Sequence, residues 1–138
     1  MIADLPIQLK SIKSVDYKKS NPQEGVGLMD WSCDSKFFFT RNDNMPNVLW
    51  IWETSKLALC SLIIQISPIR FAQWDPVHVR LAICTGNGKI YIWSKEGCSC
   101  VDIPSASFAV QNFKWNSDGK SMLLMDQGSF CVCYPALE

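Results

Sequence analysis

The sequence predicts an all-β protein made of about three similar units, and three observations lead to this fold class. Aromatic residues recur at a near-constant interval, and each interval contains several short apolar runs separated by turn residues. Helices are hard to place anywhere in the chain. The chain has 138 residues, 48% of them hydrophobic, which suits one packed unit or part of one.

Two aromatic series define the interval, which is about 40 residues long. The first series consists of Trp31, Trp74 and Trp115. The second has the same spacing from each member to the next, and each of its members closes an apolar run. Its members are Trp52, Trp93 and Tyr134. Because the two series share one period, we expect these residues to occupy equivalent positions in three repeats.

The second repeat, residues 67–106, shows the internal order most clearly. A turn at residues 75–78 separates its first two apolar runs, and Gly86, Asn87 and Gly88 form a second turn signal because glycine and asparagine tolerate positive φ. The strands expected in this repeat are residues 69–74, 79–84, 89–93 and about 98–103. Four short strands therefore fill one repeat.

The rest of the chain is predicted from the same order. Residues 25–66 form the first repeat, which has the longest middle loop, and residues 107–138 form the third, which ends before a fourth strand. Residues 1–24 differ in character, because an alternating stretch at 7–12 is followed by a polar segment. We expect a strand and a polar loop there, at the edge of a preceding unit.

The second strand of each repeat is almost continuously apolar, as in residues 81–84 and 122–125. Such a strand has both faces covered, which favours sheets stacked face to face, as in the blades of a β-propeller. Because closed propellers have about 4 to 8 blades, three four-stranded blades make an incomplete ring. We expect a chain that is marginally stable alone, that associates with itself or with other proteins, or that is a piece of a longer closed propeller.

The repeat resembles the WD repeat family over residues 25–135. The period, the tryptophan that ends the third strand and the turn after the first tryptophan match that pattern. The Gly-His pair of the family is missing. The pairs in place of Trp-Asp are Trp52-Glu53, Trp93-Ser94 and Tyr134-Pro135. The resemblance implies a partial WD-type β-propeller that acts as a non-enzymatic protein-interaction scaffold and relies more on packing than many WD blades.

Four segments carry a narrower resemblance, to the C-terminal part of a longer, centrosomal WD-repeat protein. They are Ser32-Cys33-Asp34-Ser35, residues 40–52, Gln73-Trp74-Asp75-Pro76 and Cys84-Thr85-Gly86-Asn87-Gly88. This resemblance implies a scaffold of centrosomes and centriolar satellites, with a coiled-coil satellite protein as partner and roles in spindle anchoring and ciliogenesis. Composition shows none of these.

Composition argues against several classes of partner and location. Thirteen basic and thirteen acidic residues give no net charge, so no nucleic-acid partner is expected. The densest apolar stretch, residues 57–66, is about half as long as a membrane-spanning helix, so no membrane partner is expected either. The first residues lack the features of a secretory signal and the seven cysteines are an odd number, so we expect reduced thiols in a cytoplasmic protein.

No residue pattern supports catalysis, a metal or a cofactor. His78, the single histidine, falls in a turn, where a solvated role is the simpler interpretation. Close cysteine pairs such as Cys131 and Cys133 are separated by one residue, whereas structural zinc sites use two or more, so core filling is favoured. Residues 85–89 mimic a phosphate loop but precede a strand. Two alternatives stay open: an enzyme or small-molecule binder that uses a propeller channel, and a truncated splice product without independent function.

The loop at residues 41–47 is the richest candidate for partner contact, because function in propellers resides in loops held by rigid sheets. The candidate partner-binding residues are Arg41, Asn42, Asp43 and Asn44. The alternative interpretation is that Asn and Asp only satisfy the turn backbone. Trp50 is a further candidate for partner contact, because its counterparts Tyr91 and Val132 are less strictly aromatic.

Overall fold

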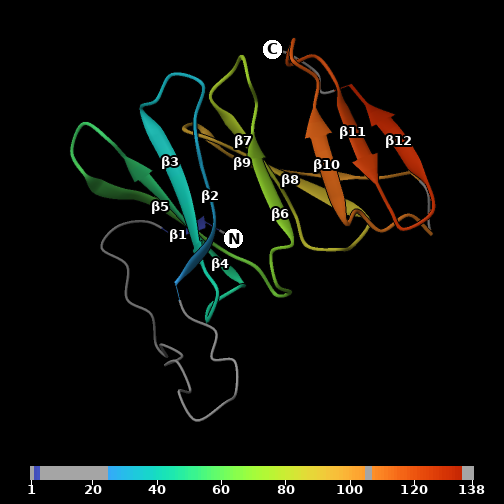
Figure 1. Ribbon diagram of the computed structural model, residues 1–138, viewed down its shortest axis with the longest axis horizontal. Helices are drawn as coiled ribbons and strands as arrows, with labels where there is room; N and C mark the ends of the chain where they lie inside the picture. Colours follow the sequence, from blue (N-terminus) through green and yellow to red (C-terminus); the bar gives the residue numbers. More distant parts are fainter. Residues whose placement is uncertain (1, 4–24, 105–106, 135–138) are drawn as a thin grey trace.

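The computed structural model describes residues 2–3, 25–104 and 107–134, and these form three antiparallel sheets that fan out from one another (Figure 1). No helix occurs in these described ranges, and none of their segments is a helix that could cross a membrane. The prediction of an all-β, open arrangement of about three blades is confirmed.

The first sheet has the strand order β1-β5-β4-β3-β2. Its strands are β1 (Ile2–Ala3), β2 (Val26–Trp31), β3 (Phe37–Asn42), β4 (Val48–Glu53) and β5 (Ala58–Ile64). The alternation of buried and half-buried residues along β3 is typical of a strand with one face in a core. Turns join β2 to β3, β3 to β4 and β4 to β5, and their backbone groups bond within the turn, as the Ser35 N–H does to the Ser32 carbonyl.

The second and third sheets are simpler. The second sheet contains β6 (Phe71–Trp74), β7 (Arg80–Cys84), β8 (Lys89–Ser94) and β9 (Gly97–Asp102) in chain order. The third contains β10 (Asn112–Trp115), β11 (Met122–Met125) and β12 (Phe130–Cys133). Strand β7 is buried along most of its length, as its continuous apolar sequence predicts.

Contacts between sheets run through their first strands, since β6 lies against both β2 and β10. One hydrophobic core fills the space between the first and second sheets, and it includes Phe39, Ile51 and Trp93. Another fills the space between the second and third sheets, and it includes Val110, Phe113 and Leu124. The second sheet is therefore covered on both faces, whereas the outer faces of the first and third sheets lie outside both cores.

At Ile2–Ala3 the structure differs from the prediction for the amino-terminal segment. These two residues pair with Leu62 and Ile63 and so extend the first sheet beyond β5, whereas the sequence placed residues 1–12 in a preceding unit. The polar loop predicted within residues 1–24 lies outside the described residues. The boundaries predicted between the units stay predictions, because two of them fall beside residues that the structure does not describe.

The first aromatic series occupies equivalent positions in the three sheets. Trp31, Trp74 and Trp115 each end the first strand of their sheet and pair with a residue of the second strand, namely Phe38, Leu81 and Met122. Their burial differs sharply: Trp74 and Trp115 are 4% and 5% exposed, whereas Trp31 is 51% exposed. Trp31 thus lies outside the core because no sheet of the described chain covers its face.

The second aromatic series is equivalent only in part. Trp52 lies opposite Phe38 and Trp93 opposite Leu81, but Cys133, and not Tyr134, lies opposite Met122. The hairpin of β11 and β12 is therefore one residue shorter between these paired positions than the hairpin of β7 and β8. A one-residue change of register moves every side chain to the other face, and Tyr134 is accordingly exposed.

Candidate functional site

The predicted partner-contact residues lie where β3 ends and turns toward β4. The Arg41 Nη1 group donates a 2.6 Å hydrogen bond to the Ile69 carbonyl, and its Nη2 group lies 3.3 Å from Asp43 Oδ1. The Asp43 N–H donates to the Gly25 carbonyl at 2.9 Å. Arg41 and Asp43 are both half-buried. Asp43 and its neighbours therefore hold the turn, as the alternative interpretation expects, while Arg41 also ties the first sheet to the segment that enters the second.

A pocket of about 740 Å³ opens beside Arg41, between the ends of the first two sheets. Its lining includes Arg41, Arg70, Thr85 and Gln111, and no acidic residue is among the described residues that line it. The Nε atom of Arg41 is buried and has no hydrogen-bond partner in the described part of the chain. Asp43 offsets the charge of Arg41, so the exposed Arg70 guanidinium gives the pocket its positive character and suits an acidic group.

Gly86 shapes the same pocket. It has a φ of +82°, and a Cβ atom at this position would collide with the Arg70 side chain. The glycine thus serves both the left-handed backbone and the close approach of Arg70. The turn of residues 85–88 joins two strands, and the Lys89 N–H bonds to the Asn87 side chain, so the hairpin-turn interpretation of this stretch agrees with the structure.

Asp75 follows Trp74 and is completely buried. Its carboxylate accepts hydrogen bonds from the backbone N–H groups of Val77 and His78, and it also contacts the His78 ring and the Arg80 guanidinium. Burial by itself raises the pKa of Asp75, but these hydrogen bonds outweigh it and hold the pKa below its usual value. His78 is part of this structural cluster, which agrees with a turn role.

Arg80 links Asp75 to the third sheet. Its Nη2 group donates to the Gly119 carbonyl at 3.0 Å, and its guanidinium lies 5.0 Å from the centre of a Trp115 ring. Gly119 has a φ of +68°, and a Cβ atom there would lie 2.5 Å from Asp75 Oδ1. Sequence reasoning missed this link, because Arg80 and Gly119 are far apart in the sequence.

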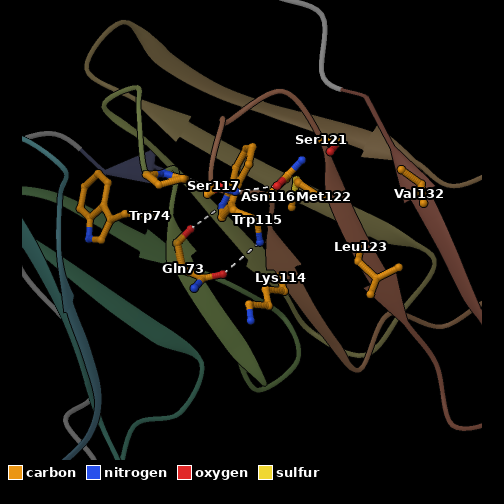
Figure 2. Close-up of a pocket in the computed structure, with 11 residues that line it drawn as sticks. Gln73, Trp74, Lys114, Trp115, Asn116, Ser117, Ser121, Met122, Leu123 and Val132 are labelled. Atoms are coloured by element: carbon orange, nitrogen blue, oxygen red, sulfur yellow. Dashed lines mark hydrogen bonds between the residues drawn. The ribbon is translucent and has the colours of Figure 1, made fainter.

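Two tryptophans make the same hydrogen bond between neighbouring sheets. Trp74 Nε1 donates to the Asp30 carbonyl at 3.1 Å, and Trp115 Nε1 donates to the Gln73 carbonyl at 3.0 Å. Figure 2 shows the second of these bonds, together with the bond from the Trp115 backbone N–H to Gln73 Oε1 at 3.2 Å. In both cases the acceptor is the residue that directly precedes the tryptophan of the preceding sheet.

Trp31 occupies the same register position but faces outward as part of an aromatic row. Its ring centre lies 5.0 Å from that of Phe38, which stacks on Trp52 at 6.3 Å. Trp52 in turn stacks on Trp50 at 6.3 Å. Met29, two residues before Trp31 on β2, is also exposed. We call this surface the Trp31 face, defined by Met29, Trp31, Phe38, Trp50 and Trp52.

The outer face of the third sheet is apolar as well. Leu123 and Val132 lie opposite each other on β11 and β12, and Met125 lies opposite Phe130. Leu123, Phe130 and Val132 are exposed. A hollow of about 550 Å³ runs from Gln73 past Trp115 to Leu123 and Val132 (Figure 2). We call the surface of Leu123, Met125, Phe130 and Val132 the third-sheet face.

The cysteines give no sign of a metal or catalytic site. All seven are free thiols, and no cluster of three or more metal-binding side chains occurs in the described ranges. Cys131 and Cys133 pack against the second core, which agrees with their predicted core role. Burial raises the pKa of Cys84 to about 11, so this thiol is neutral and unreactive at physiological pH.

Sequence comparison gives two relatives with named repeats. No protein-family profile matches the chain. Over 134 residues it is 43% identical to WD repeat-containing protein WRAP73 of Mus musculus, a match that covers 96% of this chain and 29% of the mouse protein. An uncharacterized WD repeat-containing protein of Schizosaccharomyces pombe is 24% identical over 98 residues, or 62% of this chain and 20% of that protein. The chain is a homologue of WD repeat proteins.

Solved structures show the same fold. The C-terminal WD40 domain of Sif2 superposes with a TM-score of 0.64 at 11% identity, over 84% of this chain and 36% of that chain. A chain of the mitotic checkpoint complex superposes with a TM-score of 0.59 at 19% identity, over 87% of this chain and 42% of that one. The structure thus has the fold of a partial WD40-type propeller, and WD repeat homology supports a protein-interaction scaffold as the kind of function.

The WD repeat homology explains why the Trp31 face and the third-sheet face are open. The chain spans 29% of the length of WRAP73, and its three sheets cover 36% of the Sif2 chain. Sheets of a propeller bury both faces against neighbours, so the Trp31 face and the third-sheet face are the two positions at which a WD-type ring would continue.

Proposed function

We propose that this chain is a non-enzymatic protein-interaction scaffold whose contact site is the pocket between Arg41 and Arg70. The observation that carries the proposal is a pocket of about 740 Å³ with two arginines and no acidic residue among its described lining residues. Rigid sheets hold it, because Arg41 belongs to β3 and is fixed by the Ile69 carbonyl. A preformed positive pocket of this kind binds with little loss of side-chain entropy.

The chemistry of the pocket selects an acidic protein segment. The Arg70 guanidinium is exposed, and it presents a planar set of donors that matches a carboxylate. Arg41 adds a second positive group, whose charge Asp43 partly offsets. The outer positions of coiled coils are often Glu or Lys, so a coiled coil with an acidic stripe supplies carboxylates at a suitable surface.

We further propose that this scaffold works in the cytoplasm, at centrosomes and centriolar satellites, with a coiled-coil satellite protein as partner and roles in spindle anchoring and ciliogenesis. The support is the resemblance of residues 32–35, 40–52, 73–76 and 84–88 to a centrosomal WD-repeat protein, together with the homology to a WD repeat protein. The longest of these segments contains Arg41 itself. The proposed site and the proposed location therefore rest on overlapping parts of the chain.

Proximity labelling in cells, with the chain as bait and a centrosome marker for imaging, tests the location and supplies the partner. We expect labelled coiled-coil satellite proteins, and labelling of chaperones alone would contradict the proposal. The recovered coiled-coil protein is then purified, and its Kd is measured for Arg70→Glu, for Arg70→Lys and for Lys56→Glu.

These three variants separate the pocket from general charge. Arg70→Glu is expected to weaken binding about tenfold or more, because it removes a charge pair with the acidic partner and adds repulsion. Arg70→Lys keeps the positive charge, so it is expected to weaken binding less than Arg70→Glu. Lys56 is exposed and does not line the pocket, so Lys56→Glu makes the same change of net charge without effect on binding. Equal losses for Arg70→Glu and Lys56→Glu would rule out the pocket as the contact site.

A further inference from the structure

The two sheet-to-sheet contacts within the chain follow one rule. In each, the following sheet presents a tryptophan at the end of its first strand, and the preceding sheet presents the carbonyl of the residue before its own tryptophan. The carbonyls used are those of Asp30 and Gln73, and the indoles used are those of Trp74 and Trp115. The next carbonyl in this series belongs to Lys114, and the remaining indole belongs to Trp31.

The side chains beside these groups obey the same rule. On the second sheet, Gln73, Ala82 and Ile92 lie opposite one another, and Ala82 and Ile92 pack into the core shared with the third sheet. Their register equivalents on the third sheet are Leu123 and Val132, beside Lys114. The third-sheet face therefore presents, in the same positions, the apolar half that a following sheet covers.

The Trp31 face is the other half. Trp31, Phe38 and Trp52 occupy the register positions of Trp74, Leu81 and Trp93, which are buried against the first sheet. Trp31 is 51% exposed although it belongs to this set. The described part of the chain thus has two different open surfaces. The Trp31 face matches the face of the second sheet that packs on the first sheet, and the third-sheet face matches the face of the second sheet that packs on the third.

We infer that the Trp31 face binds the third-sheet face of a second copy of this chain, head to tail, with the Trp31 indole donating to the Lys114 carbonyl of that copy. A contact between two different surfaces is heterologous, and it forms a closed ring when the rotation between copies closes. Two copies joined at both ends contain six sheets, which falls within the range of about 4 to 8 blades in closed propellers. The proposal does not depend on the Arg41 pocket or its acidic partner.

Sedimentation equilibrium on the unchanged chain and two variants tests this pairing. We expect the unchanged chain to have twice the mass of a single copy. Trp31→Ser removes the indole and Val132→Asp places a charge on the third-sheet face, so each is expected to weaken association about tenfold or more. Ile66→Ser is the control, because Ile66 is fully exposed and belongs to neither face. A monomeric unchanged chain would overturn the inference.

A mixing experiment distinguishes head-to-tail pairing from contact between identical faces. Trp31→Ser keeps its third-sheet face and Val132→Asp keeps its Trp31 face. A ring of two identical variant copies therefore has no intact contact, whereas a mixed ring has one, so the mixture is expected to associate more strongly than either variant alone. If Val132→Asp associates as strongly as the unchanged chain, the pairing is wrong. If the unchanged chain forms polymers and neither variant does, the head-to-tail pairing is supported and the two-copy ring is overturned. Thermal unfolding checks that each variant folds, and Leu123→Ser replaces Val132→Asp if the latter does not.

Discussion

Trp31, Trp74 and Trp115 occupy equivalent positions in three sheets, but only the last two lie between sheets. Alanine at the three positions is therefore expected to lower the free energy of unfolding by unequal amounts. A buried tryptophan truncated to alanine costs about 3 to 5 kcal/mol through lost burial and the cavity left behind. Loss of the indole bond to the Asp30 or Gln73 carbonyl adds about 1 kcal/mol.

The expected loss is thus about 4 to 6 kcal/mol for Trp74→Ala and for Trp115→Ala. Trp31 is about half exposed, and it has a ring contact with Phe38, so Trp31→Ala is expected to cost only about 1 to 2 kcal/mol in the monomer. Trp74→Phe keeps an aromatic ring and removes the indole donor. Its loss of stability therefore reports mainly the hydrogen bond, with a smaller change in packing.

Urea unfolding followed by circular dichroism measures these differences, at a protein concentration low enough to suppress self-association. Thermal unfolding gives a second measure. For a chain of this size, a loss of about 1 kcal/mol lowers Tm by about 3 °C, so alanine at either buried site should lower Tm by roughly 10 to 20 °C. Equal losses at all three positions, or the largest loss at Trp31, would refute the argument that burial between neighbouring sheets separates equivalent tryptophans.

Three further predictions concern Asp75, Gly119 and Cys84. Because the folded-state pKa of Asp75 lies below its unfolded value of 3.8, its contribution to stability is present above about pH 4 and is lost as the pH falls through the lower folded pKa; Asp75→Asn should flatten this acid dependence in thermal melts and lower stability by about 3 kcal/mol, because it leaves Arg80 without a buried partner. Gly119→Ala should cost about 1 to 3 kcal/mol in urea unfolding, since φ is +68° and the new Cβ meets Asp75, whereas Gly128→Ala has open space and should cost much less. Cys84 should react with a thiol reagent at mildly alkaline pH far more slowly than the exposed cysteines, as mass spectrometry of labelled peptides can measure, and fast labelling of Cys84 in the folded chain would contradict its burial and its pKa of about 11.

The succession of strands and turns within each repeat could be predicted from the sequence because it depends on local patterns. The turn signals around Asp75 and Gly86 end strands in any context, and the apolar run 81–84 requires two covered faces wherever it lies. These features return with each repeat of about 40 residues, so the sequence carries each of them several times.

The candidate site was predictable only in part. The sequence predicts residues 41–44 as contact residues because they lie in the richest loop held by the rigid sheets, and the structure uses Asp43 to hold the turn. Arg70 gave no signal, since it is a single charge between apolar residues, and it joins Arg41 only because the segment after β5 passes beside the end of β3. The link from Asp75 through Arg80 to Gly119 joins parts of the chain that are far apart in sequence, a separation that no local pattern records.

The sequence by itself determined that the chain forms short strands in repeating units, because backbone turns and alternating burial are set by neighbouring residues. Only the tertiary structure decided which face of each sheet is covered. Trp31 and Trp74 have the same place in the repeat, yet one is open and the other buried, since burial depends on whether a sheet from a distant part of the sequence lies against it. A one-residue difference in hairpin length likewise decided that Cys133, and not Tyr134, turns toward the core, because side chains alternate between the two faces of a strand.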